Sequence, residues 1–185
     1  NLVTGPADPG FLDAAAEHGL GVVAFSGAQA LGTNAAVRER VNRLDKHRAL
    51  WAWYLIDEPD LHRIPPPEVA QAYHDLRSLA FKPSFLVLMS GSSAEHYGDY
   101  TDLLAIDFYP VPWAPVSQFG KEMKLARLER DSKKYFAILQ AFNWAAFPGF
   151  IDTSVALRSP TIDEIRCMVY MALAQGADGL FFYTY

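Results

Sequence analysis

Short apolar segments alternate along the chain with longer segments of helical periodicity. Most of the apolar segments are hydrophobic on both faces, which is typical of strands in a parallel sheet covered by helices. Seven such segments predict strands: 2–4, 21–25, 51–56, 84–89, 103–108, 135–139 and 179–185.

Helix-start signals lie in several of the intervals between these strands. Asp8, just before a proline, is expected to cap the first helix, and Thr33 or Asn34 the second. Thr161 followed three residues later by Glu164 predicts a capping box at the last helix. The order of elements is therefore strand and helix in alternation, an α/β fold.

Seven parallel strands fit either a doubly wound sheet or an eight-stranded barrel. No glycine-rich phosphate loop follows an early strand, which weakens the nucleotide-binding form of the doubly wound sheet. Polar residues recur at the ends of several strands, as in barrels. We expect one domain over 1–185, a (β/α)8 TIM barrel lacking its first strand. Both ends fall inside expected strands, so we also expect a segment of a longer protein.

Composition narrows the class of protein further. The chain has 185 residues, 51% of them apolar, which suffices for a sizeable core, and a net charge of −5 argues against nucleic-acid binding. No apolar run approaches the roughly 18 residues of a membrane helix. The single cysteine, Cys167, provides neither a disulfide framework nor a thiolate metal cluster. We expect no cofactor, metal, nucleic-acid or membrane partner, and nothing here indicates an oligomeric state.

The most informative segment is 53–60, where an apolar run ends in Asp57, Glu58 and Pro59. Two carboxylates at the mouth of a buried strand are costly to desolvate. In barrels the carboxyl ends of the strands carry the active site, where such acids often perform acid/base chemistry.

The other strand ends are rich in carboxylates, amides and aromatic rings. We find no Lys or Arg at any of them, which excludes a Schiff-base aldolase and disfavours a phosphate site. A neutral, hydroxyl-rich ligand fits this set, because amides and carboxylates bind hydroxyls while aromatic faces cover the C–H patches of a sugar. The strand-end and loop residues are Ser26, Ser90, Asp107, Tyr109, Trp113, Gln140, Phe142, Asn143, Trp144, Phe147, Tyr183 and Tyr185.

The motif Asp57-Glu58-Pro59 resembles the fourth-strand motif of the (β/α)8 glycoside hydrolases, above all the large retaining clan. This resemblance implies that Gln140 ends the seventh strand and Tyr183 lies at the eighth. It implies a hydrolase of O-glycosidic bonds in a neutral oligo- or polysaccharide, with Glu58 as general acid/base. A secreted or periplasmic location would suit a polysaccharide substrate.

One position departs from the clan. The clan's nucleophilic Glu ends the seventh strand, where this chain has Gln140, and a carboxamide cannot act as that nucleophile. Asp107 is then the candidate second carboxylate, Gln140 a residue that orients a substrate hydroxyl or water, or the protein binds glycans without cleaving them. A metal-dependent hydrolase with Asp57, Glu58 and Asp107 as oxygen ligands is a further alternative.

The predicted site therefore has two groups of residues. A carboxyl separation of about 5–5.5 Å would imply retention of configuration and about 6.5–9.5 Å inversion. The catalytic candidates are Glu58, Asp107 and Asp57, and the substrate-binding candidates are Gln140, Tyr109, Asn143, Trp113, Trp144 and Tyr183.

Overall fold

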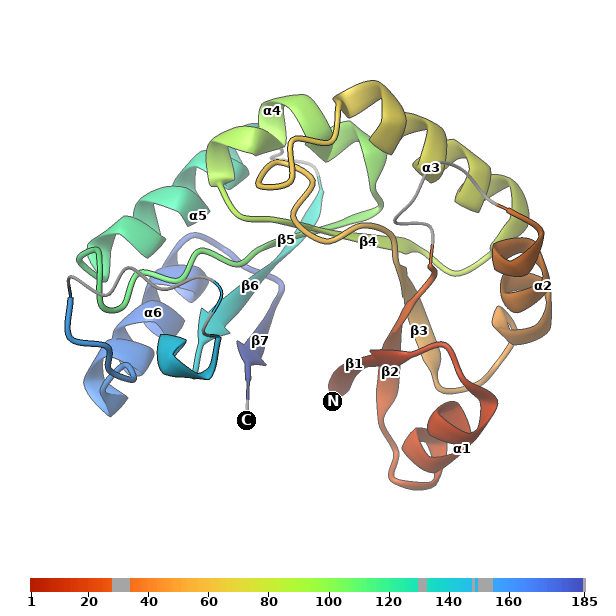
Figure 1. Cartoon of the computed structure of the whole chain (residues 1–185), viewed down its shortest axis with the longest axis horizontal. Coiled ribbons are helices and arrows are strands. Elements are labelled where there is room, and N and C mark those ends of the chain that lie inside the picture. Colours follow the sequence, from red (N-terminus) through yellow and green to blue (C-terminus); the bar gives the residue numbers. More distant parts are fainter. Residues whose placement is uncertain (28–33, 130–132, 148, 150–154, 185) are drawn as a thin grey trace. The chain divides into compact units, whose positions relative to one another are not determined.

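The computed structural model describes residues 1–27, 34–129, 133–147, 149 and 155–184. Strands and helices alternate through these residues (Figure 1). The described strands are β1 (Leu2–Pro6), β2 (Gly21–Phe25), β3 (Leu50–Tyr54), β4 (Ser84–Leu88), β5 (Leu103–Ile106), β6 (Lys134–Gln140) and β7 (Gly179–Tyr183). The described α-helices are α1 (Pro9–Glu17), α2 (Ala35–Leu44), α3 (Pro66–Leu79), α4 (Ala94–Tyr97), α5 (Ser117–Glu129) and α6 (Ile162–Ala174). The 3-10 helices with fully described residues are η1 (Gly91–Ser93), η2 (Gly98–Tyr100) and η3 (Trp144–Ala146).

The strands follow one another in the sheet in sequence order, from β1 to β7. The pairs β1/β2, β2/β3, β3/β4 and β6/β7 are parallel. The predicted α/β class with parallel strands is therefore confirmed. Parallel neighbours bring their carboxyl ends to the same edge, and this places the strand-end residues within each group of strands on one side.

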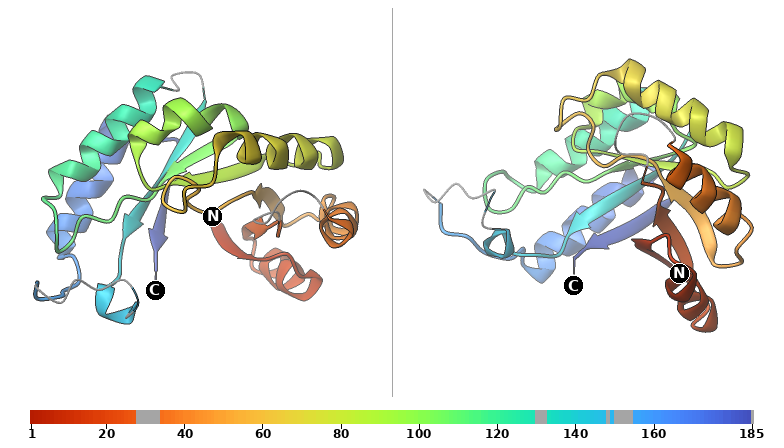
Figure 2. Two further views of the ribbon diagram at one scale, coloured as in Figure 1. Left: turned by 45° about the horizontal axis from the view of Figure 1, so that its top comes forward. Right: turned by 45° about the vertical axis from the view of Figure 1, so that its right-hand side comes forward.

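The chain divides into two compact units, 1–87 with 96–104 and 88–95 with 105–185. The first unit contains β1 to β3, nearly all of β4, and α1 to α3. The second contains β6, β7, α5 and α6, with β6 directly beside β7 (Figure 2). The predicted site residues are consequently described unit by unit.

In the first unit, helices begin where the sequence predicts them. Asp8 accepts a hydrogen bond from the backbone N–H of Phe11, at 3.0 Å, and Asn34 accepts one from Val37, also at 3.0 Å. Thr33, the alternative cap for α2, lies outside the described residues. Below the caps, apolar residues at helical spacing are buried: Leu12, Val37, Val41, Leu44, Val69 and Leu76.

In the second unit, α6 begins with the predicted capping box. The Thr161 hydroxyl accepts from the N–H of Glu164 at 3.2 Å, and the Glu164 carboxylate accepts from the N–H of Thr161 at 2.8 Å. Met168 and Ala172 bury the inner face of this helix, which packs against α5 and β6. Among the described residues, no helix is both long enough and apolar enough to span a membrane.

Candidate active site

The turn after β3 carries Glu58 in an uncommon backbone conformation. Its φ is 40°, in the left-handed region that residues other than glycine seldom adopt. The N–H of Glu58 donates to the carbonyl of Val87 at 3.1 Å, and its carbonyl accepts from the N–H of His62 at 3.0 Å. Such a conformation persists only where the surroundings fix it, and such residues cluster at active sites.

A backbone bulge produces this turn. The N–H of Leu55 donates to the carbonyl of Phe85 at 2.8 Å, and the carbonyl of Ile56 accepts from the N–H of Val87 at 3.5 Å. The next N–H that donates to β4 is that of Glu58, to the carbonyl of Val87. Three residues on one strand thus span two on its partner, one more than regular pairing allows, and such an insertion bends the strand. The sequence predicts a strand through Ile56, which is wrong by two residues, because the bulge interrupts the regular pairing after Tyr54.

Asp57 is held by a buried tyrosine. The Tyr54 hydroxyl donates to Oδ1 of Asp57 at 2.5 Å, and the ring packs against Phe25 and Phe85 at centroid distances of 4.9 and 5.6 Å. Tyr54 is 7% exposed, while Asp57 and Glu58 are both half-buried. A hydroxyl bound to a carboxylate gives a short, strong hydrogen bond.

A cation reaches the end of β2, contrary to the prediction. Arg40 of α2 donates from Nη1 to the carbonyl of Ser26 at 2.8 Å, and a Cβ at Gly27 would clash with the same nitrogen. The expectation that no Lys or Arg lies at a strand's carboxyl end is therefore wrong for β2. Arg40 escaped the sequence argument because it follows the strand by 14 residues and returns to it from a helix.

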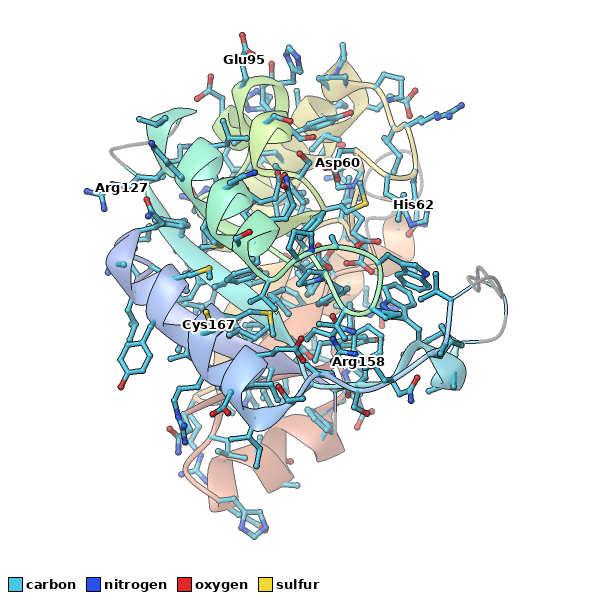
Figure 3. The ribbon with its side chains drawn as sticks, turned by 90° about the vertical axis from the view of Figure 1, so that its left-hand side faces the viewer. Asp60, His62, Glu95, Arg127, Arg158 and Cys167 are labelled. Atoms are coloured by element: carbon cyan, nitrogen blue, oxygen red, sulfur yellow. The ribbon has the colours of Figure 1, made fainter. Side chains whose placement is uncertain are left out.

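The loop after Glu58 is also anchored by Tyr97, the last residue of α4. Figure 3 shows Asp60 and His62 on this loop. The hydroxyl of Tyr97 donates to the carbonyl of Ile64 at 2.8 Å, and burial together with the charge of Asp60 raises the pKa of Tyr97. His62 is exposed. Among the described residues no group of three or more His, Cys, Asp and Glu is placed to hold a metal ion.

In the second unit, Asp107 directly follows β5. Its N–H donates to the carbonyl of Leu88 at 3.1 Å, and the residue is only 5% exposed. Glu122 of α5, which the sequence argument missed, fixes the neighbouring turn: its carboxylate accepts from the N–H of Gly91 at 2.9 Å and from the Ser90 hydroxyl at 3.1 Å. Glu122 also accepts from Gln118 one turn earlier, at 2.8 Å, but its two partners in the turn lie more than 30 residues away and carry no local sequence signal.

Gln140, at the end of β6, is fully buried and bound to loop backbone. Its Oε1 accepts from the N–H of Val111 at 2.9 Å, and its Nε2 donates to the carbonyl of the same residue at 2.7 Å. A further bond to the Phe142 carbonyl is 3.4 Å long. These contacts tie the loop after β5 to β6. Both amide ends, which the prediction assigned to a substrate hydroxyl or water, are engaged here by protein groups.

Six aromatic side chains gather beyond the ends of β5, β6 and β7, and we call them the aromatic cluster. Tyr109 stacks on Tyr183 at 5.9 Å, and Trp113 contacts Trp144 at 5.0 Å. Trp113 is 37% exposed and Tyr183 is 42% exposed, so two faces of the cluster are open to solvent. The members are Tyr109, Trp113, Phe142, Trp144, Phe147 and Tyr183.

All six predicted substrate-binding residues lie in the second unit. Asn143 lies among them, and its side-chain oxygen accepts from the N–H of Ala145 at 2.9 Å, which caps η3. Asp57 and Glu58 belong to the first unit, and Asp107 belongs to the second. Tyr185 lies outside the described residues.

Comparison with solved structures identifies the fold. The β-glucuronidase of Lactobacillus rhamnosus matches with a TM-score of 0.68 and 17% identity, over 100% of this chain and 37% of that enzyme. The GH99 endo-α-mannosidase of Bacteroides thetaiotaomicron matches with 0.64 and 15%, over 94% of this chain and 58% of that one. The chain has a glycoside-hydrolase-like fold.

A third enzyme extends this glycoside-hydrolase-like group. The GH128 endo-β-1,3-glucanase of Lentinula edodes matches with a TM-score of 0.61 and 11% identity, over 90% of this chain and 66% of that enzyme. The chain spans less than two thirds of each of the three enzymes. At these identities the likeness extends to the fold alone, which many chemistries share. No protein-family model and no curated protein matches the chain.

Proposed function

We propose that this protein hydrolyses O-glycosidic bonds of a neutral oligo- or polysaccharide, with Glu58 as the general acid/base. The observation that carries the proposal is the Glu58 turn: a carboxyl residue directly after a parallel strand, held at a φ of 40° by a bulge in a glycoside-hydrolase-like fold. Glycoside hydrolysis needs one carboxyl group to protonate the leaving oxygen.

Asp107 is the proposed second carboxylate, as nucleophile or as the base that activates a water. Its position directly after β5 and its burial support this role, because a buried carboxylate is costly unless chemistry or hydrogen bonding requires it. Asp57 is proposed to orient the neighbouring carboxyl group of Glu58. In this assignment Gln140 positions the loop that begins at Asp107, through its two bonds to Val111.

The aromatic cluster supports a sugar substrate. Trp113 and Tyr183 are partly exposed members of the cluster, at 37% and 42%, and aromatic rings suit the C–H patches of a sugar ring and freeze few rotors. We propose a neutral sugar because the segments that follow β5 and β6, 107–116 and 141–149, contain no Lys or Arg. Arg158, later in the same unit, is paired with Glu164 at 2.6 and 2.7 Å. This would separate the protein from the glucuronidases that it resembles in fold.

A second candidate function is glycan binding without cleavage. The observation that favours it is Gln140, which stands where the resemblance expects a nucleophilic Glu and whose amide is bound by loop backbone. This candidate predicts affinity for a glycan without turnover.

The test is product release by the full-length protein from a panel of glycosides. The panel contains a β-galactoside, an α-L-fucoside, an α-mannoside, a β-1,3-glucan and, as the charged comparison, a β-glucuronide. We expect release from at least one neutral member, and a loss of about 10²–10⁴-fold in kcat/KM for Glu58→Gln. Asp107→Asn should also abolish turnover.

Each other outcome contradicts a defined part of the proposal. Binding of a neutral glycan without any release would favour the binding protein. Full activity of Glu58→Gln would overturn the acid/base assignment. Release from the glucuronide alone would contradict the neutral substrate.

A further inference from the structure

We propose that Tyr54 is a positioning residue: its hydroxyl, acting through Asp57, fixes the bulged turn that aims the Glu58 carboxyl. This inference rests on the proposed function and adds to it a residue that touches neither the substrate nor the reacting bond. It follows from three sets of contacts, all within the first unit.

The first set places Tyr54 rigidly. It is the last residue of β3, and its N-terminal neighbour Trp53 is fully buried. Its ring packs against Phe25 of β2 and Phe85 of β4, and its carbonyl accepts from the N–H of Ser26 at 3.0 Å. The Tyr54 ring is therefore held in place, and with it the position of its hydroxyl.

The second set of contacts links Tyr54 to the turn. The Tyr54 hydroxyl binds Oδ1 of Asp57 at 2.5 Å, across the extra residue of the bulge. Backbone bonds from Leu55 to Phe85 and from Glu58 to Val87 close the bulge on the side of β4. The side-chain bond adds a second link, so residues 55–58 are held both to β4 and to Tyr54.

The third set shows why the turn needs this support. Glu58 has a φ of 40°, a conformation that is unfavourable for residues other than glycine and persists only when its surroundings hold it. Without the hydroxyl, the turn can relax toward an ordinary strand end. The Glu58 carboxyl would then move, and a displacement of about 1 Å at a reacting group can cost about 10²-fold in rate.

The chain offers a matched control in the same unit. Tyr73 of α3 also donates from its hydroxyl to an aspartate, Oδ1 of Asp102, at 3.2 Å. Asp102 precedes β5 and binds the N–H of Ser84 at the start of β4, at the opposite end of these strands from Glu58. Tyr73→Phe thus removes the same kind of bond far from the proposed chemistry. Both substitutions keep the aromatic ring.

The experiment compares Tyr54→Phe and Tyr73→Phe in the full-length protein on two glycosides of the sugar that the panel selects. The methoxy group of a methyl glycoside must be protonated on its oxygen as it leaves. The dinitrophenolate group of a dinitrophenyl glycoside leaves without being protonated. For Tyr54→Phe we expect kcat/KM on the methyl glycoside to fall by about 10–100-fold. We expect kcat/KM on the dinitrophenyl glycoside to change by less than about threefold, because the general acid contributes little to cleavage of that bond. Tyr73→Phe should leave the ratio of the two rates unchanged.

A second readout is independent of activity. Backbone hydrogen exchange at Glu58, whose N–H binds Val87, should become about fivefold faster in Tyr54→Phe, the effect of losing one typical hydrogen bond. Tyr73→Phe should not change it. This measurement reports on the turn even if the protein only binds glycans.

The outcomes separate this inference from the proposed function. Loss of activity in Glu58→Gln with an unchanged rate ratio in Tyr54→Phe would overturn the role of Tyr54 alone. Equal losses on both glycosides would identify a general structural effect and likewise overturn it. Absence of hydrolysis by the parent would overturn the proposed function, and unchanged exchange at Glu58 would then overturn the support that Tyr54 gives the turn.

Discussion

The ends of β3 and β6 present polar residues in opposite ways. At β3 the chain leaves regular pairing through a bulge, and Glu58 is half-buried at a positive φ. At β6 the strand stays regular through Gln140, which is fully buried. Both ends of its side-chain amide form hydrogen bonds with the backbone of Val111. A polar residue at a strand end is thus not a functional group by position alone. The local backbone decides whether it is offered to a ligand or used by the fold.

The largest effect that this comparison predicts for stability concerns Gln140. Gln140→Leu keeps the approximate volume but leaves the N–H and carbonyl of Val111 without their partner in a buried place. We expect the free energy of unfolding to fall by about 1–3 kcal/mol, measured by urea denaturation. Gln71→Leu, at an exposed glutamine that bonds only within α3, should change it by less than about 0.5 kcal/mol. Equal free energies of unfolding for Gln140→Leu and Gln71→Leu would contradict the claim that the fold depends on the buried amide of Gln140.

A smaller effect is expected at the open face of the aromatic cluster. Trp113→Ala removes one of its exposed rings and should weaken glycan binding by about 1 kcal/mol, or about fivefold, with little change in kcat. The measurement is a titration with the best glycan of the panel. Phe81→Ala, at an aromatic residue that is 83% exposed and lies outside the cluster, is the control. A loss of affinity in both variants would remove the special role of the cluster.

The smallest effect concerns Glu164, a surface glutamate that is used by the fold, in contrast to Glu58. Glu164 is bound by Arg158 at the surface, and this bond, with that to the N–H of Thr161, lowers its pKa from 4.5 to about 2. A lowered folded-state pKa stabilises the fold above pH 4.5, and this contribution is lost as pH falls through about 2. Glu164→Gln should therefore reduce stability at pH 7 by less than about 1 kcal/mol, because exposed ion pairs contribute little.

The difference between parent and Glu164→Gln should shrink as pH falls from 4.5 toward 2 in thermal unfolding. Activity at neutral pH should stay unchanged, because Glu164 is not at a strand end. A difference that grows on acidification would contradict the assignment of the shift to the Arg158 pair.

Much of the fold could be predicted because its signals are local. Strands apolar on both faces, caps such as Asp8 and Asn34, and the box of Thr161 and Glu164 lie within a few residues of the elements that they define. The end of β3 could not be predicted, because its bulge depends on pairing with Phe85 and Val87, about 30 residues further along the chain.

The candidate site could be predicted only as a set of residue types at strand ends. Glu58 and Asp57 stand out because carboxylates end an apolar run. The bonds of Gln140 to Val111 and of Arg40 to Ser26 join residues 29 and 14 positions apart, and no spacing rule reveals them. The role of Tyr54, by contrast, rests on a residue only three positions from Asp57, yet it becomes visible only with the bulge.

The most direct test of the central claim is the leaving-group dependence of Glu58→Gln. The rates of parent and variant would be measured on the methyl and dinitrophenyl glycosides of the same neutral sugar. We predict a loss of about 10²–10⁴-fold in kcat/KM on the methyl glycoside and a far smaller loss on the dinitrophenyl glycoside, as expected when a general acid is removed. Equal losses on both, or none on either, would contradict the assignment of Glu58 as the acid.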